Sequence, residues 1–427
     1  MNERVQVVVI GAGLAGSAAA LALARGGAKV VVLERRSEGE LGHLPGGWIS
    51  GAVVSKLFSN WRQEIPLERR VVEQRLSLLT QDGAVWIDHS DRSEGEKPAS
   101  VFTMRRDRFD PWMLQKVREA GAELRLGVDV SGVSYNAVVG RTQVVHSTGR
   151  IDCTVAVIAT GIDALLRPNS RGRPQPHLTG LHETLEGEAG LIDRRFGAKG
   201  DRGVVMRFVL GFLGAEERGL GYLATYRNGI GSGVVLQTPP TVDRESRVRE
   251  VLEQFKGHWV VAPFLRNLEK VGESVQRIPT HFSAGRLYAP GQLFAGDGGG
   301  LHGWSGAWTS GWSTALRSGR AAGAAALEAV RTNDGSEARL EAYVTHLRED
   351  GVIRDTRRGL RAMNGLWFDH RLHRTYPRAF SDLLHRMMTE TGAPKEPIAK
   401  AARSVFRAQG VRAIGLLRDA NRLGKGA

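Results

Sequence analysis

The sequence predicts an α/β fold with a second domain of α+β type and a helical C-terminal region. Three observations support this prediction. A strand-helix-strand pattern with spaced glycines opens the chain, alternating apolar and polar residues dominate between 182 and 236, and residues 331–427 are helical and basic in character. We predict a discontinuous first domain at 1–47, 101–167 and 286–330, a second domain at 48–100 and 168–285, and the helical region at 331–427.

The opening pattern has the spacing of a nucleotide-binding turn. An apolar run at 7–10 leads into Gly11-Ala12-Gly13-Leu14-Ala15-Gly16, and an alanine-rich helix follows. Gly11 permits a tight turn, Gly13 lets the backbone approach a pyrophosphate, and Gly16 lets helix and strand pack closely. The phosphates would then lie at the positive end of the helix.

The second apolar run, 30–33, ends at Glu34, which lies eighteen residues after Gly16. A carboxylate at this strand end can bind the hydroxyls of an adenosine ribose. Strand, helix and acid in this register predict a Rossmann-like dinucleotide site, although the pattern alone leaves FAD and NAD open.

The chain between this unit and residue 290 reads as alternating elements. We predict strands at 71–79, 84–88, 123–126, 128–133, 141–146 and 153–158, the last ending at Gly161. Asp110 and Pro111 predict the N-cap and first residue of a helix that runs to Glu119. Strands at 204–209, 221–226, 231–236 and 273–278, with a helix at 244–255, predict an antiparallel sheet.

Composition narrows the class of protein. With 41% hydrophobic residues, no long apolar run and no secretory signal, the chain reads as a cytoplasmic enzyme. The single cysteine, Cys153, excludes an intramolecular disulfide and an iron-sulfur cluster held within the chain, and no other metal-binding pattern occurs. The net charge of +14 favours solvated surface arginines over nucleic-acid binding.

A second nucleotide-binding signal lies near residue 296. Gly296-Asp297 follows a short apolar run and precedes a helix of small residues that begins near Ser313. The aspartate can bind a ribityl hydroxyl, and the helix N-terminus can support negative charge on a reduced flavin. Together with the first fingerprint, this turn predicts FAD. Gly298, Gly300 and Gly303 repeat the GxGxxG spacing, but without a following acidic residue we interpret them as a loop beside the flavin.

Aromatic and histidine residues in these loops are candidates for substrate chemistry. Trp304, Trp308 and Trp312 recur every four residues and would share one face if helical, which is compatible with core packing or with lining a substrate site. Loop residues His43 and His302 could move protons beside the flavin, although lone loop histidines are commonly only solvated.

Two helices near the C-terminus, 398–409 and 411–423, combine arginines with apolar residues such as Ile398 and Ile414. Such helices can lie on anionic lipid or on an acidic partner protein. We favour packing on the protein's own surface, which leaves at most a peripheral membrane contact.

Nearly the whole chain resembles the FixC family, the short relatives of electron-transferring-flavoprotein:quinone oxidoreductase within the geranylgeranyl-reductase-like flavoproteins. The resemblance runs through VVVIGAGLAGSAAAL, PLERRVVEQRL, RFDPWMLQKVREAGAEL, DRRFGAKGDRGVV, Gly296-Asp297, Ser318-Gly319-Arg320-Ala321-Ala322 and Tyr376-Pro377. It implies a fold of p-hydroxybenzoate-hydroxylase type, with an FAD domain and a substrate domain.

Site residues follow from this resemblance by position. It implies that the ADP half of FAD contacts the fingerprint and the end of the second strand, and that the flavin half contacts later loops. The implied cofactor residues are Gly11, Gly13, Leu14, Ala15, Gly16, Glu34, Arg35, Gly46, Gly47, Arg106, Val130, Gly161, Gly296 and Asp297. Trp48 joins the three later tryptophans as a substrate-lining candidate. Thr160, Gly42-His43 and the stretch 298–312 depart from the family pattern.

We therefore expect an FAD-dependent oxidoreductase that acts on a small organic substrate, in specialised metabolism. One alternative is a monooxygenase that uses external NAD(P)H and oxygen. Another is a protein that exchanges electrons with an acidic carrier protein, a ferredoxin or a quinone through its basic surface. An RNA-associated flavoprotein, suggested by the charge, ranks below these, and we expect no nucleic-acid partner.

Overall fold

The opening strand-helix-strand unit forms as predicted in the computed structural model. The structure describes residues 3–40, 46–91, 100–162, 177–282, 287–305, 308–309, 311–367, 371–390 and 396–426. Strands β2 (Val7–Ile10) and β3 (Val30–Glu34) are parallel and flank helix α1 (Leu14–Arg25) in sequence. Residues of both strands are almost fully buried, which explains their continuous β-branched runs.

A six-stranded sheet extends this unit in the order β18-β19-β12-β2-β3-β8. The added strands are β8 (Glu123–Leu126), β12 (Val155–Ile158), β18 (Tyr288–Ala289) and β19 (Gln292–Phe294). One face packs on α1, α4 (Arg106–Glu119) and α8 (Gly311–Thr332). The other face packs on a four-stranded sheet formed by β1 (Glu3–Arg4), β9 (Val130–Asn136), β10 (Arg141–His146) and β11 (Gly149–Cys153).

Helix α4 begins at Arg106, earlier than the sequence predicted. Its N-cap is Arg105, so Asp110 is not the cap and Pro111 lies inside the helix. The carboxylate of Asp110 instead accepts two hydrogen bonds from the Arg106 guanidinium, at 2.5 and 2.7 Å. This i,i+4 ion pair supports an additional helical turn that local capping preferences do not predict.

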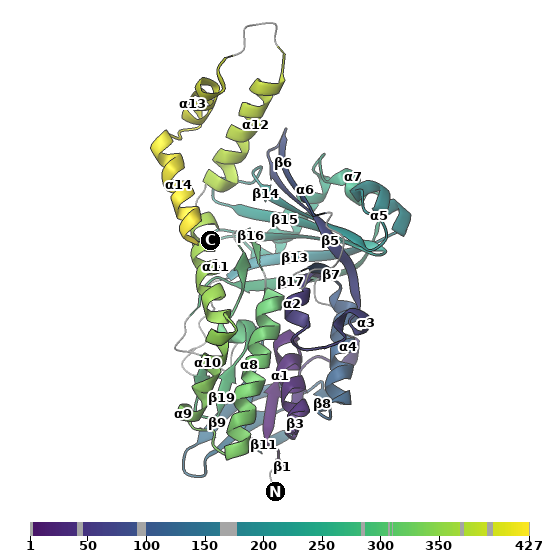
Figure 1. Ribbon diagram of the computed structural model, residues 1–427, viewed down its shortest axis with the longest axis vertical. Helices are drawn as coiled ribbons and strands as arrows, with labels where there is room; N and C mark the ends of the chain where they lie inside the picture. Colours follow the sequence, from purple (N-terminus) through teal and green to yellow (C-terminus); the bar gives the residue numbers. More distant parts are fainter. Residues whose placement is uncertain are drawn as a thin grey trace.

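A nine-stranded sheet forms the upper part of the molecule in Figure 1. Its strands are β4 (Gly47–Ser50), β5 (Leu67–Leu79), β6 (Ala84–Ser90), β7 (Val101–Met104), β13 (His177–Glu186), β14 (Arg202–Leu210), β15 (Arg218–Tyr226), β16 (Gly229–Gln237) and β17 (Glu269–Pro279). The predicted antiparallel pairing is confirmed for β14, β15, β16 and β17, whereas β5, which was not part of that prediction, pairs with β14 in parallel. These two strands come from chain segments far apart in sequence, so no hairpin sets their direction.

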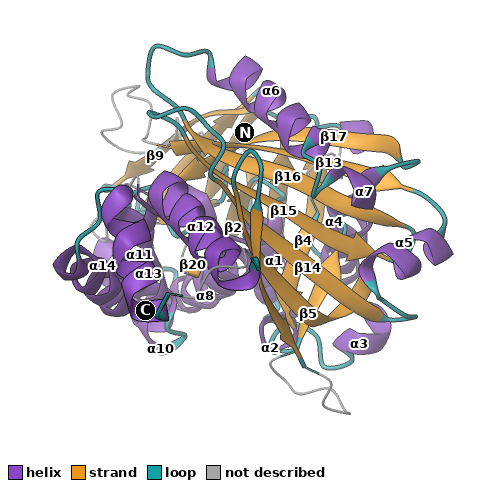
Figure 2. Ribbon diagram, turned by 90° about the horizontal axis from the view of Figure 1, so that it is seen from above, coloured by secondary structure: helices purple, strands orange, loops and turns teal. Residues whose placement is uncertain are grey.

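Helices cover the two faces of this sheet (Figure 2). Helices α5 (Ala189–Phe196), α6 (Arg244–Gly257) and α7 (Ala262–Leu265) pack on one face. On the other face, Met363 and Trp367 of α11 (Val352–Trp367) are buried against strand residues that include Leu78 and Val209. The predicted domain boundaries themselves stay a prediction.

Shorter elements and the C-terminal helices complete the chain. They are η1 (Glu38–Glu40), α2 (Gly51–Val54), α3 (Trp61–Glu64), η3 (Gly296–Gly299), β20 (Trp304–Ser305), β21 (Trp308–Thr309), α9 (Glu337–Leu340), α10 (Ala342–Glu349), η4 (Arg371–Thr375), α12 (Tyr376–Met388), α13 (Ile398–Ala408) and α14 (Ala413–Gly426). In the described part of the chain, no helix is long and apolar enough to cross a membrane.

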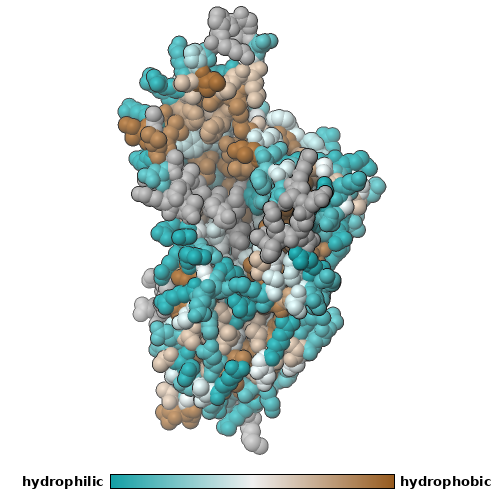
Figure 3. All heavy atoms as spheres, in the orientation of Figure 1, coloured by the Kyte–Doolittle hydropathy of each residue, from teal (hydrophilic) through white to brown (hydrophobic). Residues whose placement is uncertain are grey.

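The C-terminal helices bury only part of their apolar surface. Val405, Phe406 and Val411 form a small core with Ala379 of α12. By contrast, Ile414 is 80% exposed and Leu417 is 72% exposed. Hydrophobic side chains accordingly gather over α12, α13 and the start of α14 at the upper end of the molecule (Figure 3).

Candidate functional site

The fingerprint turn is shaped by contacts that leave no room for side chains at two glycines. Gly11 has a φ of +96°, and a Cβ there would lie 2.7 Å from the carbonyl oxygen of Ala159. A Cβ on Gly16 would lie 1.8 Å from the carbonyl oxygen of Gly11. Around Gly13, by contrast, a Cβ would meet no atom within 4 Å. Gly13 is also the N-cap of α1 and provides no side-chain cap, so the helix start can accept an anion.

Glu34 lies beside this turn and is only 4% exposed. Its Oε2 accepts a 2.7 Å hydrogen bond from the backbone N–H of Ala12, and its Oε1 accepts hydrogen bonds from the backbone and the guanidinium of Arg36. Burial opposes ionisation, but these hydrogen bonds outweigh it and hold the pKa of Glu34 below its ordinary value. Arg35, which the resemblance implied, has an exposed side chain, and its neighbour Arg36 makes the ion pair.

Helices α1 and α8 run side by side in Figure 1. Their contact brings the Gly296-Asp297 turn next to the fingerprint turn. A Cβ on Gly319 of α8 would lie 2.0 Å from the carbonyl oxygen of Ala15. Gly296 has a φ of +60°, and its backbone N–H donates a 3.0 Å hydrogen bond to Ser318 Oγ. The Gly296-Asp297 turn is therefore fixed at the N-terminal side of α8, against α1.

Further predicted cofactor residues lie around these two turns. Gly161, with a φ of +72°, follows β12, and its carbonyl oxygen would lie 3.5 Å from a Cβ on Gly298. Val130 begins β9, two residues after Val128, whose backbone N–H donates to the carbonyl oxygen of Glu34 at 2.9 Å. The hydroxyl of Thr160 is buried and has no hydrogen-bond partner in the described part of the chain. An open helix N-terminus and an unsatisfied buried hydroxyl together fit a phosphate-bearing cofactor.

A second group of predicted residues joins the nucleotide-binding segments to the nine-stranded sheet. The guanidinium of Arg106 lies 5.5 Å from the ring centroid of Trp312 in the first turn of α8. A Cβ on Gly47 would meet the same indole at 3.4 Å. The neighbouring Gly46 donates a 3.1 Å hydrogen bond from its backbone N–H to Nε2 of His182 on β13.

Several functional candidates on the sheet were missed by sequence reasoning. His182 is 4% exposed, and its Nδ1 is hydrogen bonded to the hydroxyl of Tyr222 on β15. Burial lowers the pKa of His182 to about 3 and raises the pKa of Tyr222 above its ordinary value. Beside them, the Arg207 guanidinium lies 4.8 Å from the ring centroid of Trp48. Glycines occupy every second position at the start of β16, as at Gly231 and Gly233. This alternation could have predicted that large side chains from the two neighbouring strands meet over β16.

The three later tryptophans do not form a helical stripe. Trp304 lies in β20, Trp308 in β21 and Trp312 in α8, because a two-stranded hairpin precedes the helix. Trp304 is 6% exposed and packs in the apolar core beside α11, with its ring centroid 6.5 Å from that of Trp367. The side chain of Trp308 lies outside the described residues.

The two predicted histidines have different outcomes. His302 is 6% exposed, and its Nδ1 lies 2.8 Å from Oδ1 of Asp297. Its Nε2 has no hydrogen-bond partner within the described ranges. His43 lies outside the described residues, so its place in the site stays a prediction.

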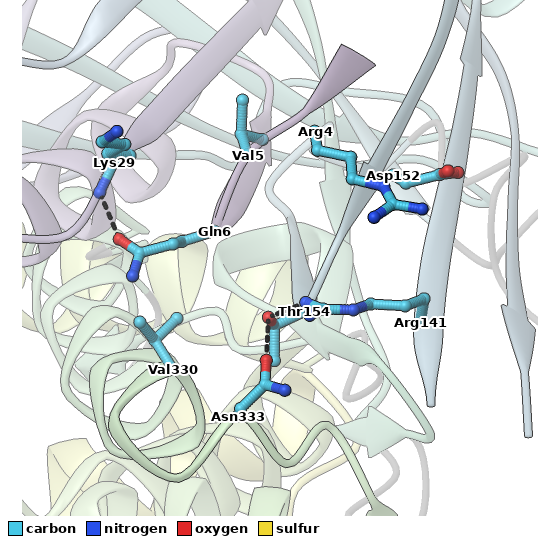
Figure 4. Close-up of a pocket in the computed structure, with 9 residues that line it drawn as sticks. All are labelled: Arg4, Val5, Gln6, Lys29, Arg141, Asp152, Thr154, Val330 and Asn333. Carbon is cyan, nitrogen blue, oxygen red and sulfur yellow. Dashed lines mark hydrogen bonds between the residues drawn. The ribbon is translucent and has the colours of Figure 1, made fainter. Parts of the chain in front are cut away.

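A cavity of about 300 Å³ lies away from these residues (Figure 4). It is formed near the N-terminal ends of β2 and β12, whereas the glycine turns follow the C-terminal ends of those strands. Polar lining groups already bind one another, because Arg141 donates to Thr154 at 2.7 Å and the backbone N–H of Lys29 donates to Gln6 at 2.7 Å. In open α/β sheets, ligands bind at the carboxyl ends of the strands, so this cavity is not the candidate site.

Comparison with known families finds relatives among FAD-dependent oxidoreductases. Residues 6–166 match the family model described as FAD dependent oxidoreductase. Protein FixC of Bradyrhizobium diazoefficiens is 30% identical over 419 residues, which cover 95% of each chain. A probable electron transfer flavoprotein-quinone oxidoreductase of Escherichia coli is 28% identical over 430 residues, covering 98% of each chain.

Solved structures show the same fold at low sequence identity. A geranylgeranyl bacteriochlorophyll reductase-like protein of Thermoplasma acidophilum superposes with a TM-score of 0.71 at 16% identity, covering 99% of this chain and 100% of the other. A probable FAD-dependent monooxygenase of Pseudomonas aeruginosa gives a TM-score of 0.60 at 17% identity, covering 87% of this chain and 98% of the other.

Proposed function

Because this chain belongs to the FixC family of FAD-dependent oxidoreductases, we propose that its reaction takes place on a small organic substrate held between the FAD and the nine-stranded sheet. FAD supplies the electron-transfer chemistry, and the protein supplies position and electrostatics. The observation that carries the proposal is the junction at Gly46 and Gly47. There the start of α8 and the strand residues His182 and Trp48 come together.

We assign the ADP half of FAD to the open side of the fingerprint turn. Gly13 leaves space for the pyrophosphate, and the buried Glu34 carboxylate faces the same turn through Ala12. Because both oxygens of Glu34 already accept hydrogen bonds, a ribose hydroxyl would compete with Arg36 for this carboxylate. Asp297 would hold the ribityl chain at the other end, next to α8.

His302 is our candidate for proton movement beside the flavin. Its Nδ1 is held by Asp297, which leaves Nε2 as the atom that can take or give a proton. A carboxylate that orients an imidazole in this way fixes the tautomer that is present.

The experiment is an anaerobic reaction of the FAD-loaded protein with a panel of organic reductants and with NADH or NADPH. Bleaching of the flavin by an organic substrate without oxygen would support substrate oxidation at the flavin. Oxidation of NAD(P)H that requires both a substrate and oxygen, with oxygen incorporated into the product, would select monooxygenation instead. A flavin that exchanges electrons with neither class of compound contradicts the proposal.

A second candidate is electron exchange with an acidic carrier protein. The net charge of +14 supports it, as does the relative whose name describes transfer between a flavoprotein and quinone. Steering between opposite charges predicts an exchange rate that falls about tenfold or more as salt rises from about 0.05 to 0.5 M. Stopped-flow reduction of the bound FAD by a reduced acidic carrier flavoprotein or ferredoxin measures this rate, and a rate that ignores salt excludes such docking.

A further inference from the structure

The hydrogen bond between His182 and Tyr222 depends on a glycine that lies between them. Gly233 of β16 pairs with His182 on one side and with Tyr222 on the other. A Cβ on Gly233 would lie 2.6 Å from Cε1 of Tyr222. Because Gly233 has no side chain, the two rings approach each other across β16, with centroids 5.8 Å apart and planes 15° from parallel.

The partners of His182 determine where its proton lies. Nε2 accepts the hydrogen bond from the backbone N–H of Gly46, and the hydroxyl of Thr184 lies 3.3 Å from the same nitrogen. Burial keeps the ring neutral, because it lowers the pKa of His182 to about 3. A neutral imidazole that accepts at Nε2 carries its proton on Nδ1. His182 therefore donates from Nδ1 to the oxygen of Tyr222.

This direction leaves the phenol proton of Tyr222 available for another acceptor. In the described part of the chain, His182 is the hydrogen-bond partner of the Tyr222 hydroxyl. Tyr222 is partly exposed, as is Trp48, whose ring centroid lies 5.5 Å from that of Tyr222. The Tyr222 side chain is thus partly open to solvent, although its surroundings are buried enough to raise the pKa of the phenol. Gly46, where the FAD-binding segments meet the sheet, binds the other ring nitrogen of His182, and Trp48, two residues after Gly46, contacts Tyr222.

We propose that the Tyr222 hydroxyl donates a hydrogen bond to a carbonyl-type oxygen of the substrate, and that His182 is the positioning residue that fixes this donor. This assignment rests on the proposed function, because it places the substrate at the same junction. A phenol that already accepts from a histidine is polarised and becomes a better donor. The adjacent indole favours a flat, uncharged, conjugated compound as the ligand.

The test uses the FAD-loaded protein and two probes, 1,4-naphthoquinone and naphthalene, which share a ring system and differ in the acceptor oxygens. Calorimetric titration of the oxidised holoenzyme gives both affinities. We expect Tyr222→Phe to weaken naphthoquinone binding about tenfold and to leave naphthalene binding unchanged, since one hydrogen bond is lost and the ring remains. Tyr226→Phe is the matched control, because the buried Tyr226 hydroxyl has no hydrogen-bond partner within the described residues.

The role of His182 is tested by two substitutions. Gln can accept from Gly46 and donate to Tyr222, whereas Leu can do neither. His182→Leu should weaken naphthoquinone binding as much as Tyr222→Phe does. His182→Gln should retain most of the parent protein's affinity for naphthoquinone. Nitrogen NMR of histidine-labelled protein should show His182 protonated at Nδ1.

Several results would overturn the assignment. The first is that the parent protein and Tyr222→Phe bind naphthoquinone equally well. The second is that the parent protein binds naphthoquinone no more tightly than naphthalene. The third is that NMR finds the proton of His182 on Nε2. Loss of bound FAD from the parent protein would instead contradict the proposed function, so the two failures are distinguishable by the flavin absorbance.

Discussion

At the scale of single residues, two glycines of one fingerprint have different physical roles. Gly16 is required by the protein itself, because a Cβ there would lie 1.8 Å from the carbonyl oxygen of Gly11. Gly13 has no such neighbour within 4 Å, so we propose that its missing side chain leaves space for the ligand. The motif therefore combines a requirement of folding with a requirement of binding.

This difference gives the first prediction. Gly16→Ala should lower the melting temperature of the apoprotein severely or prevent folding. Gly13→Ala should leave that temperature unchanged and weaken FAD binding at least about tenfold, because the methyl group occupies the space of the pyrophosphate. Circular dichroism of the apoprotein and titration with FAD measure the two effects, and loss of stability in Gly13→Ala would contradict this division.

The buried His182 gives a prediction for the acid stability of the protein. Its pKa is about 3 when folded, whereas an unfolded histidine has a pKa of about 6.5. The unfolded state therefore binds more protons below about pH 6.5, and the contribution of the neutral ring to stability is lost as pH falls toward the folded pKa. This contribution is fully present above about pH 6.5.

Replacing His182 by Gln should remove this dependence. Between about pH 6 and pH 4, the free energy of unfolding of the parent protein should fall more steeply than that of His182→Gln, by about 1.4 kcal/mol per pH unit. Urea unfolding at several pH values measures both slopes, and the other titrating groups cancel in the comparison. Parallel curves would show that His182 is protonated or exposed in the folded state.

At the scale of elements, the sequence predicted those helices and strands whose formation depends on residues close together in the chain. The unit β2-α1-β3 was predictable because its strands and turn are contiguous and follow one spacing. The start of α4 was not, because the ion pair between Arg106 and Asp110 outweighs the capping preference of Asp110. The tryptophan spacing gave the wrong period, since a hairpin at β20 and β21 interrupts it before α8.

The His182 and Tyr222 pair shows why part of the site could not be predicted. The two residues are 40 positions apart in the chain, and they meet only because Gly233 of a third strand lies between them. No single segment contains this information. Sheet register creates it, and alternating glycines in one strand are its only trace in the sequence.

The contact between α1 and α8 gives a prediction at this scale. Gly→Ala in an exposed helix stabilises a protein by up to about 1 kcal/mol. At Gly319 the added methyl would lie 2.0 Å from the carbonyl oxygen of Ala15, so we expect destabilisation of about 1–3 kcal/mol. Gly257→Ala at the end of α6, where a Cβ meets no atom within 4 Å, is the control and should be neutral or stabilising. Denaturant unfolding compares them, and equal effects would contradict the close contact.

At the scale of the whole molecule, the candidate site forms from segments that are distant in the chain. The fingerprint, the strand ends near Gly161 and the turn at Gly296 surround one end of α1, and the nine-stranded sheet adjoins them through Gly46. The cofactor could be read from the glycines and from Asp297, and the family from the wider resemblance, above all PLERRVVEQRL and DRRFGAKGDRGVV. Most of the proposed substrate side could not, because His182 and Tyr222 lie on strands that meet only after folding; Trp48 was the predicted part of it.

The measurement that tests this account most directly is calorimetric titration of the apoprotein with FAD and, separately, with NAD⁺. The account predicts that one FAD binds per chain, that NAD⁺ binds far more weakly, and that Gly13→Ala reduces the affinity for FAD while the protein stays folded. A folded apoprotein that binds no FAD, or that prefers NAD⁺, would contradict it.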